Sequence, residues 1–178
     1  MIEIEIKILN IDKEKIIKTL QSLGAKFVGE FFIVEEHFDF EDGRIKKQNE
    51  LLRIRTVNEK NELCYKKKTE PDSNFKVREE IETEIENIQS LKKIFTQLGI
   101  SSTVHREKKR TSFSFNSVRI EIDQYPSIPT YMEIEGTTAD IEDTLKKLNF
   151  EMKHTTAMSA TQVLKHYGAD HTFQKFSL

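Results

Sequence analysis

Charged residues stand at every second position in several short stretches of this sequence, and each stretch carries mostly one sign of charge. Because side chains alternate between the two faces of a strand, residues two apart share a face. Neighbouring carboxylates can hold a hard cation such as Mg²⁺ or Mn²⁺ through oxygen atoms, whereas converging Arg and Lys side chains suit phosphate groups. The pattern therefore predicts a site for a divalent metal and a polyphosphate. The acidic stretches are Glu3/Glu5, Glu121/Asp123 and Glu133/Glu135, and the basic stretches are Arg53/Arg55, Lys66/Lys68 and Arg106/Lys108/Arg110.

The opposite face of these stretches is apolar, as Ile4/Ile6 and Ile120/Ile122 illustrate. An open antiparallel sheet with one solvated face would explain the alternation by itself. However, the charges are sorted by sign, and Thr, Ser and Gln, which a merely solvated face would favour, are missing from the charged positions. We therefore expect about eight strands to close into a barrel whose apolar side lies outward under helices and whose charges line a tunnel. Such a lining is unfavourable unless water, ions or a highly charged ligand fills it.

The strands and helices that would position these residues follow from hydrophobic periodicity. The two halves of the chain share an order of strand, helix and strands, and Ser22-Leu23-Gly24 is echoed by Gln97-Leu98-Gly99, which indicates a duplicated unit. Residues 42–49, which are polar and include a glycine, are expected to form a loop. We expect strands at 1–8, 26–40, 51–58, 62–69, 76–85, 102–115, 118–124 and 131–137, and helices at 12–24, 87–99, around Ile141, Leu145 and Leu148, and at 159–167.

Length and composition exclude several classes of protein. The chain has 178 residues, which fit one domain; we expect that domain at residues 1–170 and a C-terminal tail at 171–178. With 28 Lys plus Arg against 30 Asp plus Glu, the net charge of −2 gives no bulk attraction to nucleic acid or to an anionic membrane, so neither is an expected partner. A lone Cys64 cannot form an internal disulfide, and we expect a cytoplasmic protein, either a monomer or a homodimer.

The charged stretches resemble the signature of the CYTH superfamily, also called triphosphate tunnel metalloenzymes, which includes class IV adenylyl cyclases and thiamine triphosphatases. The family's N-terminal ExExK motif stands here as Glu3-Ile4-Glu5-Ile6-Lys7. One such motif would be weak evidence, but further elements follow in the family's order over residues 1–137. They are Leu52-Arg53-Ile54-Arg55, Tyr65-Lys66, Arg78-Glu79-Glu80-Ile81-Glu82, Lys108-Lys109-Arg110-Thr111-Ser112-Phe113 with Phe in place of the family's Tyr, Glu121-Ile122-Asp123 and Glu133-Ile134-Glu135-Gly136.

The resemblance implies an α+β fold, a closed eight-stranded antiparallel β tunnel barrel of two ferredoxin-like halves with the helices packed outside. It also implies Mg²⁺ or Mn²⁺ as cofactor and a small triphosphate as ligand, either ATP, thiamine triphosphate or tripolyphosphate. The implied metal ligands are Glu3, Glu5, Asp123, Glu133 and Glu135, with Glu80 and Glu82 as further candidates. The implied catalytic residues are Glu3, Glu5, Lys7 and Arg110, and the implied triphosphate-binding residues are Lys7, Arg53, Arg55, Lys66, Arg78, Lys108 and Arg110.

Two departures from the family pattern affect the choice of subfamily. Ser159 is followed by Ala160 where the family often has Tyr, and His37 stands where an aromatic residue such as Tyr is common. Two reactions remain open. Residues 107–110, which precede an aromatic strand, resemble the class IV cyclases, which convert ATP to cyclic AMP and pyrophosphate. The alternatives are a triphosphatase, or a non-catalytic module that binds polyphosphate or nucleotides.

Overall fold

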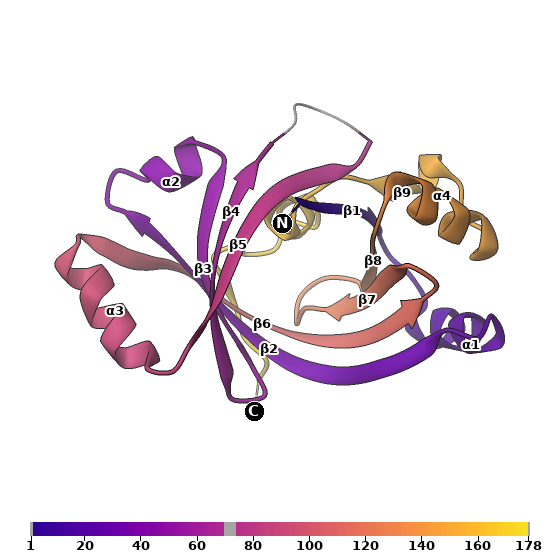
Figure 1. Cartoon of the computed structure of the whole chain (residues 1–178), viewed down its shortest axis with the longest axis horizontal. Coiled ribbons are helices and arrows are strands. Elements are labelled where there is room, and N and C mark those ends of the chain that lie inside the picture. Colours follow the sequence, from indigo (N-terminus) through magenta and orange to yellow (C-terminus); the bar gives the residue numbers. More distant parts are fainter. Residues whose placement is uncertain (1, 70–73, 178) are drawn as a thin grey trace.

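The computed structural model describes residues 2–69 and 74–177 and confirms the closed antiparallel barrel of eight strands (Figure 1). Going around the ring, the order is β1, β5, β4, β3, β2, β6, β7 and β8, and β8 pairs with β1 to close it. The barrel strands are β1 (Ile2–Ile8), β2 (Lys26–Phe40), β3 (Glu50–Val57), β4 (Lys60–Lys68), β5 (Lys76–Ile85), β6 (Ile100–Phe115), β7 (Val118–Gln124) and β8 (Tyr131–Glu135). The expected domain and tail also include residues 1, 70–73 and 178, which lie outside the described residues.

The first, third and fourth helices pack against the apolar outer side of the barrel, as expected (Figure 1). Ile16 and Leu20 of the first helix and Ile141 and Leu145 of the fourth join one buried cluster with strand residues such as Ile6. Phe95 of the third helix joins a second cluster at the other side of the barrel. None of the described helices is long and apolar enough to cross a lipid bilayer. The helices are α1 (Lys13–Ser22), α2 (Arg44–Lys47), α3 (Ile88–Gln97), α4 (Thr138–Lys147) and α5 (Ala160–His166), with a 3-10 turn at Met152–His154.

The chain order supports a duplicated unit. β1 pairs with β5, and β2 pairs with β6. If each of the strands β1–β4 is exchanged in turn with its counterpart in β5–β8, the order of strands around the ring therefore stays the same. The helices of the two halves also begin and end alike. The side chains of Asp12 and Asn87 cap α1 and α3, and Gly24 and Gly99 follow these helices at φ of 80° and 76°, a conformation that favours glycine.

Three short elements were not expected from the sequence. The loop predicted at 42–49 contains the single-turn helix α2, whose first amides at Ile45 and Lys46 donate to the buried carboxylate of Asp39. A four-residue helix has no apolar periodicity, and the carboxylate that accepts from it belongs to the preceding strand β2, so the sequence carries no local signal for it. The short strand β9 (Thr155–Thr156) pairs with β1, and the short strand β10 (Phe173–Gln174) pairs with β6. Each does so at a point where a neighbouring barrel strand has ended.

Candidate active site

The inner wall of the barrel carries the charges that the sequence singled out. Residues directly opposite each other across paired strands share a face, and the register places Glu5 opposite Glu135, Lys7 opposite Glu133, and Arg110 opposite Asp123. Most of these side chains are buried. The buried charged residues that belong to this wall are Glu5, Lys7, Glu35, Arg53, Lys66, Arg106, Lys108, Glu121 and Asp123.

Lys7 joins two carboxylates from different strands. Its ammonium group pairs with Glu5 on the same strand and lies 3.0 Å from Oε1 of Glu133 on β8. Lys76 of β5 adds a second ammonium group, 2.9 Å from Oε1 of Glu5. Burial alone would raise the carboxylate pKa values. Lys7 and Lys76 nevertheless hold the pKa of Glu5 below its ordinary value. Lys7, followed by Arg110 and Lys108, holds the pKa of Glu133 well below its ordinary value. Both carboxylates are therefore charged at neutral pH.

The ion pairs continue along the wall through Arg110. Its Nη2 lies 3.0 Å from Oε2 of Glu133, and both Nε and Nη2 lie 2.6 Å from the oxygens of Asp123. Lys108 donates to the same aspartate at 2.9 Å and lies 3.6 Å from Glu35, which in turn accepts from Arg53 at 3.1 Å. A single chain of ion pairs thus crosses the tunnel from Glu5 to Arg53.

Three of the predicted triphosphate-binding residues do not join this chain of ion pairs. Lys66 pairs with Glu80 and lies 3.2 Å from Oε2 of Glu3. Arg55 lies 2.7 Å from Glu62 and 3.6 Å from Glu82, and its side chain is less buried. Arg78 is directed elsewhere, because its Nη1 donates to the main-chain carbonyl of Asn49.

Glu135 is less neutralised than Glu5 and Glu133 on the same wall. Burial raises its pKa, Arg119 opposes this at 3.7 Å, and the nearby carboxylates of Glu3, Glu5 and Glu121 raise it further. Carboxylate oxygens that repel one another are suitable ligands for a hard divalent cation, which would relieve the repulsion. The chemistry of these donors fits the metal that the sequence pattern predicts. The five predicted metal ligands, however, are not gathered into one tight cluster.

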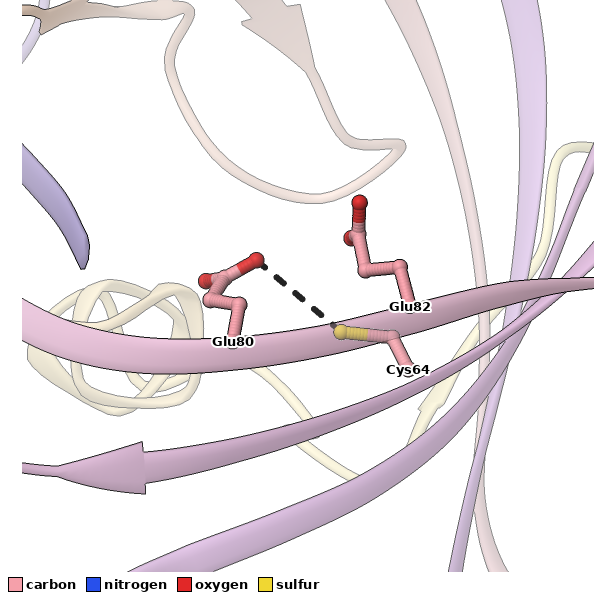
Figure 2. Close-up of side chains that lie close together, drawn as sticks. All are labelled: Cys64, Glu80 and Glu82. Atoms are coloured by element: carbon pink, nitrogen blue, oxygen red, sulfur yellow. Dashed lines mark hydrogen bonds between the residues drawn. The ribbon is translucent and has the colours of Figure 1, made fainter. Parts of the chain in front are cut away.

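Within the described ranges, the metal-capable groups that do lie within 4.8 Å of one another are Cys64, Glu80 and Glu82 (Figure 2). This cluster is a poor match for Mg²⁺ or Mn²⁺. Burial raises the pKa of the Cys64 thiol to about 11, so its sulfur is a neutral thiol that donates to Glu80 at 3.9 Å. Glu80 also pairs with Lys66. The cluster is thus better described as a hydrogen-bonded part of the wall than as a metal centre.

Three inner-wall residues were missed as site candidates. Glu35 lies between Lys108 and Arg53, and these cations hold its pKa well below the ordinary value despite burial. Lys76 contacts Glu5, and Glu121 accepts from Ser112 at 2.6 Å and lies 3.3 Å from Arg110. The sequence did mark Glu121 as a possible site residue, because it belongs to the acidic stretch Glu121/Asp123. Nothing comparable marks Glu35, because its strand mixes apolar, aromatic and acidic residues.

The C-terminal segment is attached to one end of this wall. Arg106 is buried, and its guanidinium donates to the main-chain carbonyl of His171 and, at 3.0 Å, to the hydroxyl of Thr161 in α5. Phe173 and Gln174 then run parallel to His105 and Arg106. Part of the segment expected to be a tail therefore belongs to the sheet, and Arg106, although basic, is occupied by the protein itself.

A comparison with family models matches residues 1–165 to the CYTH domain. Among curated proteins, the chain is 30% identical over 162 residues to "Putative adenylate cyclase" of Methanocaldococcus jannaschii, which corresponds to 91% of this chain and 92% of the relative.

Two solved structures with the same fold are similar at lower identity. A "putative adenylate cyclase" from Vibrio parahaemolyticus is 14% identical, with a TM-score of 0.78 over 93% of this chain and 98% of the other. A "putative adenylyl cyclase" from Hippeastrum, described as having a dominant triphosphatase activity, is 17% identical, with a TM-score of 0.66 over 94% of this chain and 96% of the other.

Proposed function

The chain belongs to the CYTH domain family, and from this membership we propose that it is a divalent-metal-dependent enzyme that acts on a triphosphate held inside the barrel. The observation that carries the proposal is the chain of ion pairs from Glu5 to Arg53. Such a set of buried, mutually paired charges is weak evidence for stability, because desolvation offsets much of the attraction. It is instead well suited to exchange its internal partners for a metal and a polyanion.

The residues divide into two roles in this proposal. Glu3, Glu5 and Glu135, together with Asp123 and Glu133, would supply oxygen ligands to Mg²⁺ or Mn²⁺, with Glu80 and Glu82 as further candidates. Lys7, Arg53, Arg55, Lys66, Arg78, Lys108 and Arg110 would bind the phosphate oxygens.

A bound divalent cation would supply charge neutralisation on the phosphate oxygens and a lowered pKa of the attacking hydroxyl or water. The protein's own groups supply positioning and electrostatic stabilisation, which dominate phosphoryl-transfer catalysis. When phosphate oxygens replace Asp123 as partners of Arg110, the guanidinium keeps a bidentate geometry. The carboxylates released in this exchange become available to the cation. Lys7 and Arg110 are the catalytic cations because both would contact the triphosphate while also holding Glu133 in place.

We propose the cyclisation of ATP to cyclic AMP and pyrophosphate as the first activity, because the relative at 30% identity is named as an adenylate cyclase. In this reaction the 3′-hydroxyl of the ribose attacks the α-phosphorus and pyrophosphate leaves. The alternative is hydrolysis, in which water attacks the terminal phosphorus. The charges of the inner wall serve either reaction, since both bind the same triphosphate chain.

The proposal is tested by incubating the purified protein with ATP, thiamine triphosphate or tripolyphosphate, each with Mg²⁺, Mn²⁺ or EDTA, and identifying the products by chromatography. Cyclic AMP with pyrophosphate establishes the cyclase. Orthophosphate release establishes the triphosphatase. If no substrate gives a metal-dependent product, the enzymatic proposal is wrong and the protein is a binding module.

A further inference from the structure

Buried polar atoms without a partner occur at one end of the inner wall. Within residues 2–69 and 74–177, the buried side-chain nitrogen and oxygen atoms that lack a hydrogen bond are Nε and Nη2 of Arg53 and Oη of Tyr125. Leaving a buried donor unpaired costs roughly 1–3 kcal/mol, so native proteins seldom retain such groups without a reason. The two residues come from β3 and from the segment directly after β7, and both are linked to Glu35, Arg53 directly and Tyr125 through Lys108.

The free atoms of Arg53 form one side of its guanidinium group. Nη1 donates to Oε1 of Glu35 at 3.1 Å, which leaves Nε and Nη2. The N–H bonds of this pair run parallel and match two oxygens of one oxyanion. Arg53 is buried, and ion pairing with Glu35 raises its pKa although burial opposes this, so the unpaired edge belongs to a permanent cation. This edge is a preformed bidentate donor.

Tyr125 brings a third donor to the same place. It is buried, it follows Asp123 by two positions, and its ring lies 5.8 Å from the ammonium nitrogen of Lys108. Lys108 is also the residue that lies 3.6 Å from Glu35. A phenolic hydroxyl keeps its proton at neutral pH, so the hydroxyl of Tyr125 can donate a hydrogen bond. Its stacking neighbour Tyr131 differs, because that hydroxyl is already bonded to Asp123 at 3.3 Å.

We propose that the hydroxyl of Tyr125 and the free edge of Arg53 form one subsite for a phosphoryl group of the triphosphate, with Tyr125 donating a hydrogen bond to a phosphoryl oxygen. This inference rests on the proposed function and adds Tyr125 to it. A carboxylate would use both of its oxygens on the Arg53 edge. A terminal phosphoryl group has three free oxygens, so one remains for the tyrosine. The three donors therefore select a terminal phosphoryl group.

The test compares the wild-type protein with Tyr125→Phe, using tripolyphosphate as the probe and EDTA to prevent turnover, with affinity measured by calorimetry. A hydrogen bond to a charged group contributes about 1.5–3 kcal/mol, so the variant should bind tripolyphosphate roughly 10- to 100-fold more weakly. Because the hydroxyl has no partner in the free protein, Tyr125→Phe should be at least as stable as the wild type in urea. A purely structural role would instead lower stability and leave the affinity unchanged.

Tyr167→Phe is the matched control, because Tyr167 packs against the same apolar cluster under α5. It should bind tripolyphosphate as the wild type does. Equal affinity of Tyr125→Phe and the wild type would overturn the subsite, as would a loss of affinity accompanied by an equivalent loss of stability. If the wild type binds no tripolyphosphate in EDTA, the metal-free subsite is overturned; failure of the proposed function is a different outcome, seen as the absence of a metal-dependent product from every substrate in the turnover assay.

Discussion

Glu5 and Glu135 face each other across the β1–β8 pair, so two carboxylates are direct neighbours on the inner wall of the barrel. Their electrostatic surroundings are nevertheless opposite. Glu5 is paired with Lys7 and Lys76, which lower its pKa, whereas burial and the neighbouring acids raise the pKa of Glu135. Like charges placed directly opposite are destabilising unless a cation lies between them. The two residues should therefore respond differently to neutralisation.

Glu135→Gln should lower metal-dependent turnover by at least about 100-fold, the magnitude found when a single preorganised electrostatic group is removed. Its folded pKa lies above the ordinary value, so at pH 7 its ionisation opposes folding, and removal of the charge should leave the free energy of unfolding equal or higher. Steady-state kinetics and urea denaturation of the same preparation measure both effects. Normal turnover with saturating metal would exclude Glu135 as a metal ligand.

Glu5→Gln should abolish turnover and, unlike Glu135→Gln, should destabilise the protein. Its folded pKa is lowered, so its charge stabilises the fold above the ordinary pKa, and its loss leaves Lys7 and Lys76 without this buried partner. Removing one member of a buried pair costs about 3–5 kcal/mol. Urea denaturation at pH 7 provides the measurement. A variant as stable as the wild type would contradict the ion-pair network on this wall.

Binding of Mg²⁺ or Mn²⁺ should raise the melting temperature of the wild-type protein, because the cation binds the folded state and relieves repulsion around Glu135. For a chain of this size, each kcal/mol of stabilisation corresponds to roughly 2–4 °C. Thermal unfolding with and without metal measures the shift, and EDTA should reverse it. Glu135→Gln serves as the control and should show a smaller shift; an equal shift would place the metal elsewhere.

His37 should make the wild-type protein sensitive to mild acid. Its pKa is lowered to about 3, chiefly by burial and then by the cations Arg106, Arg53 and Lys108, while Glu35 opposes the shift. The unfolded chain therefore binds a proton near the ordinary pKa of 6.5 that the folded protein does not bind, and stability is lost as the pH falls below 6.5 toward 3. The free energy of unfolding of His37→Gln should fall less than that of the wild type between pH 7 and about 5.5. The slope of this free energy against pH should be smaller by the equivalent of up to one bound proton. Urea denaturation across this range tests it, and identical slopes would contradict it.

Arg106→Met should release the C-terminal segment from the barrel. The side chain is buried and donates to the carbonyl of His171 and to Thr161, so its loss leaves an unpaired carbonyl and removes a neighbour of Glu35. We expect a loss of several kcal/mol and faster digestion by carboxypeptidase, detected by mass spectrometry. Thr161→Val removes one of these bonds and should cost about 1 kcal/mol. Unchanged digestion of Arg106→Met would contradict the anchoring role.

The barrel could be predicted from the sequence because several strands keep one charged and one apolar face throughout. β7 shows this clearly, with Ile120 and Ile122 buried under the helices and Asp123 on the inner wall. The long β2 shows why prediction failed for Glu35. The inward-facing positions of β2 include Ile33, which lies opposite Lys108, and a register shift between His37 and Phe38 breaks the alternation. A face with mixed chemistry and a bulge gives no periodic signal.

The sequence also could not predict which charged side chains already have partners within the protein. Arg106 belongs to the same basic stretch as Lys108 and Arg110, yet its partners are Thr161 and a carbonyl at His171, both far away in the sequence. Similarly, the ExExK motif identifies Glu5 but not the ammonium group of Lys76 that contacts it from β5. Sequence spacing reports which side chains share a face, whereas pairing between elements depends on the three-dimensional closure of the barrel.

That closure also determines when the barrel can form during protein synthesis. β1 is the first of the barrel strands along the chain, but its register partners include Glu79 on β5 and Glu135 on β8. Such distant partners make folding slow compared with proteins dominated by local contacts. The edge of β1 where Glu5 and Lys7 meet their β8 partners therefore remains unpaired until residue 135 has been added, and the closed inner wall can form only after most of the matched domain has been translated.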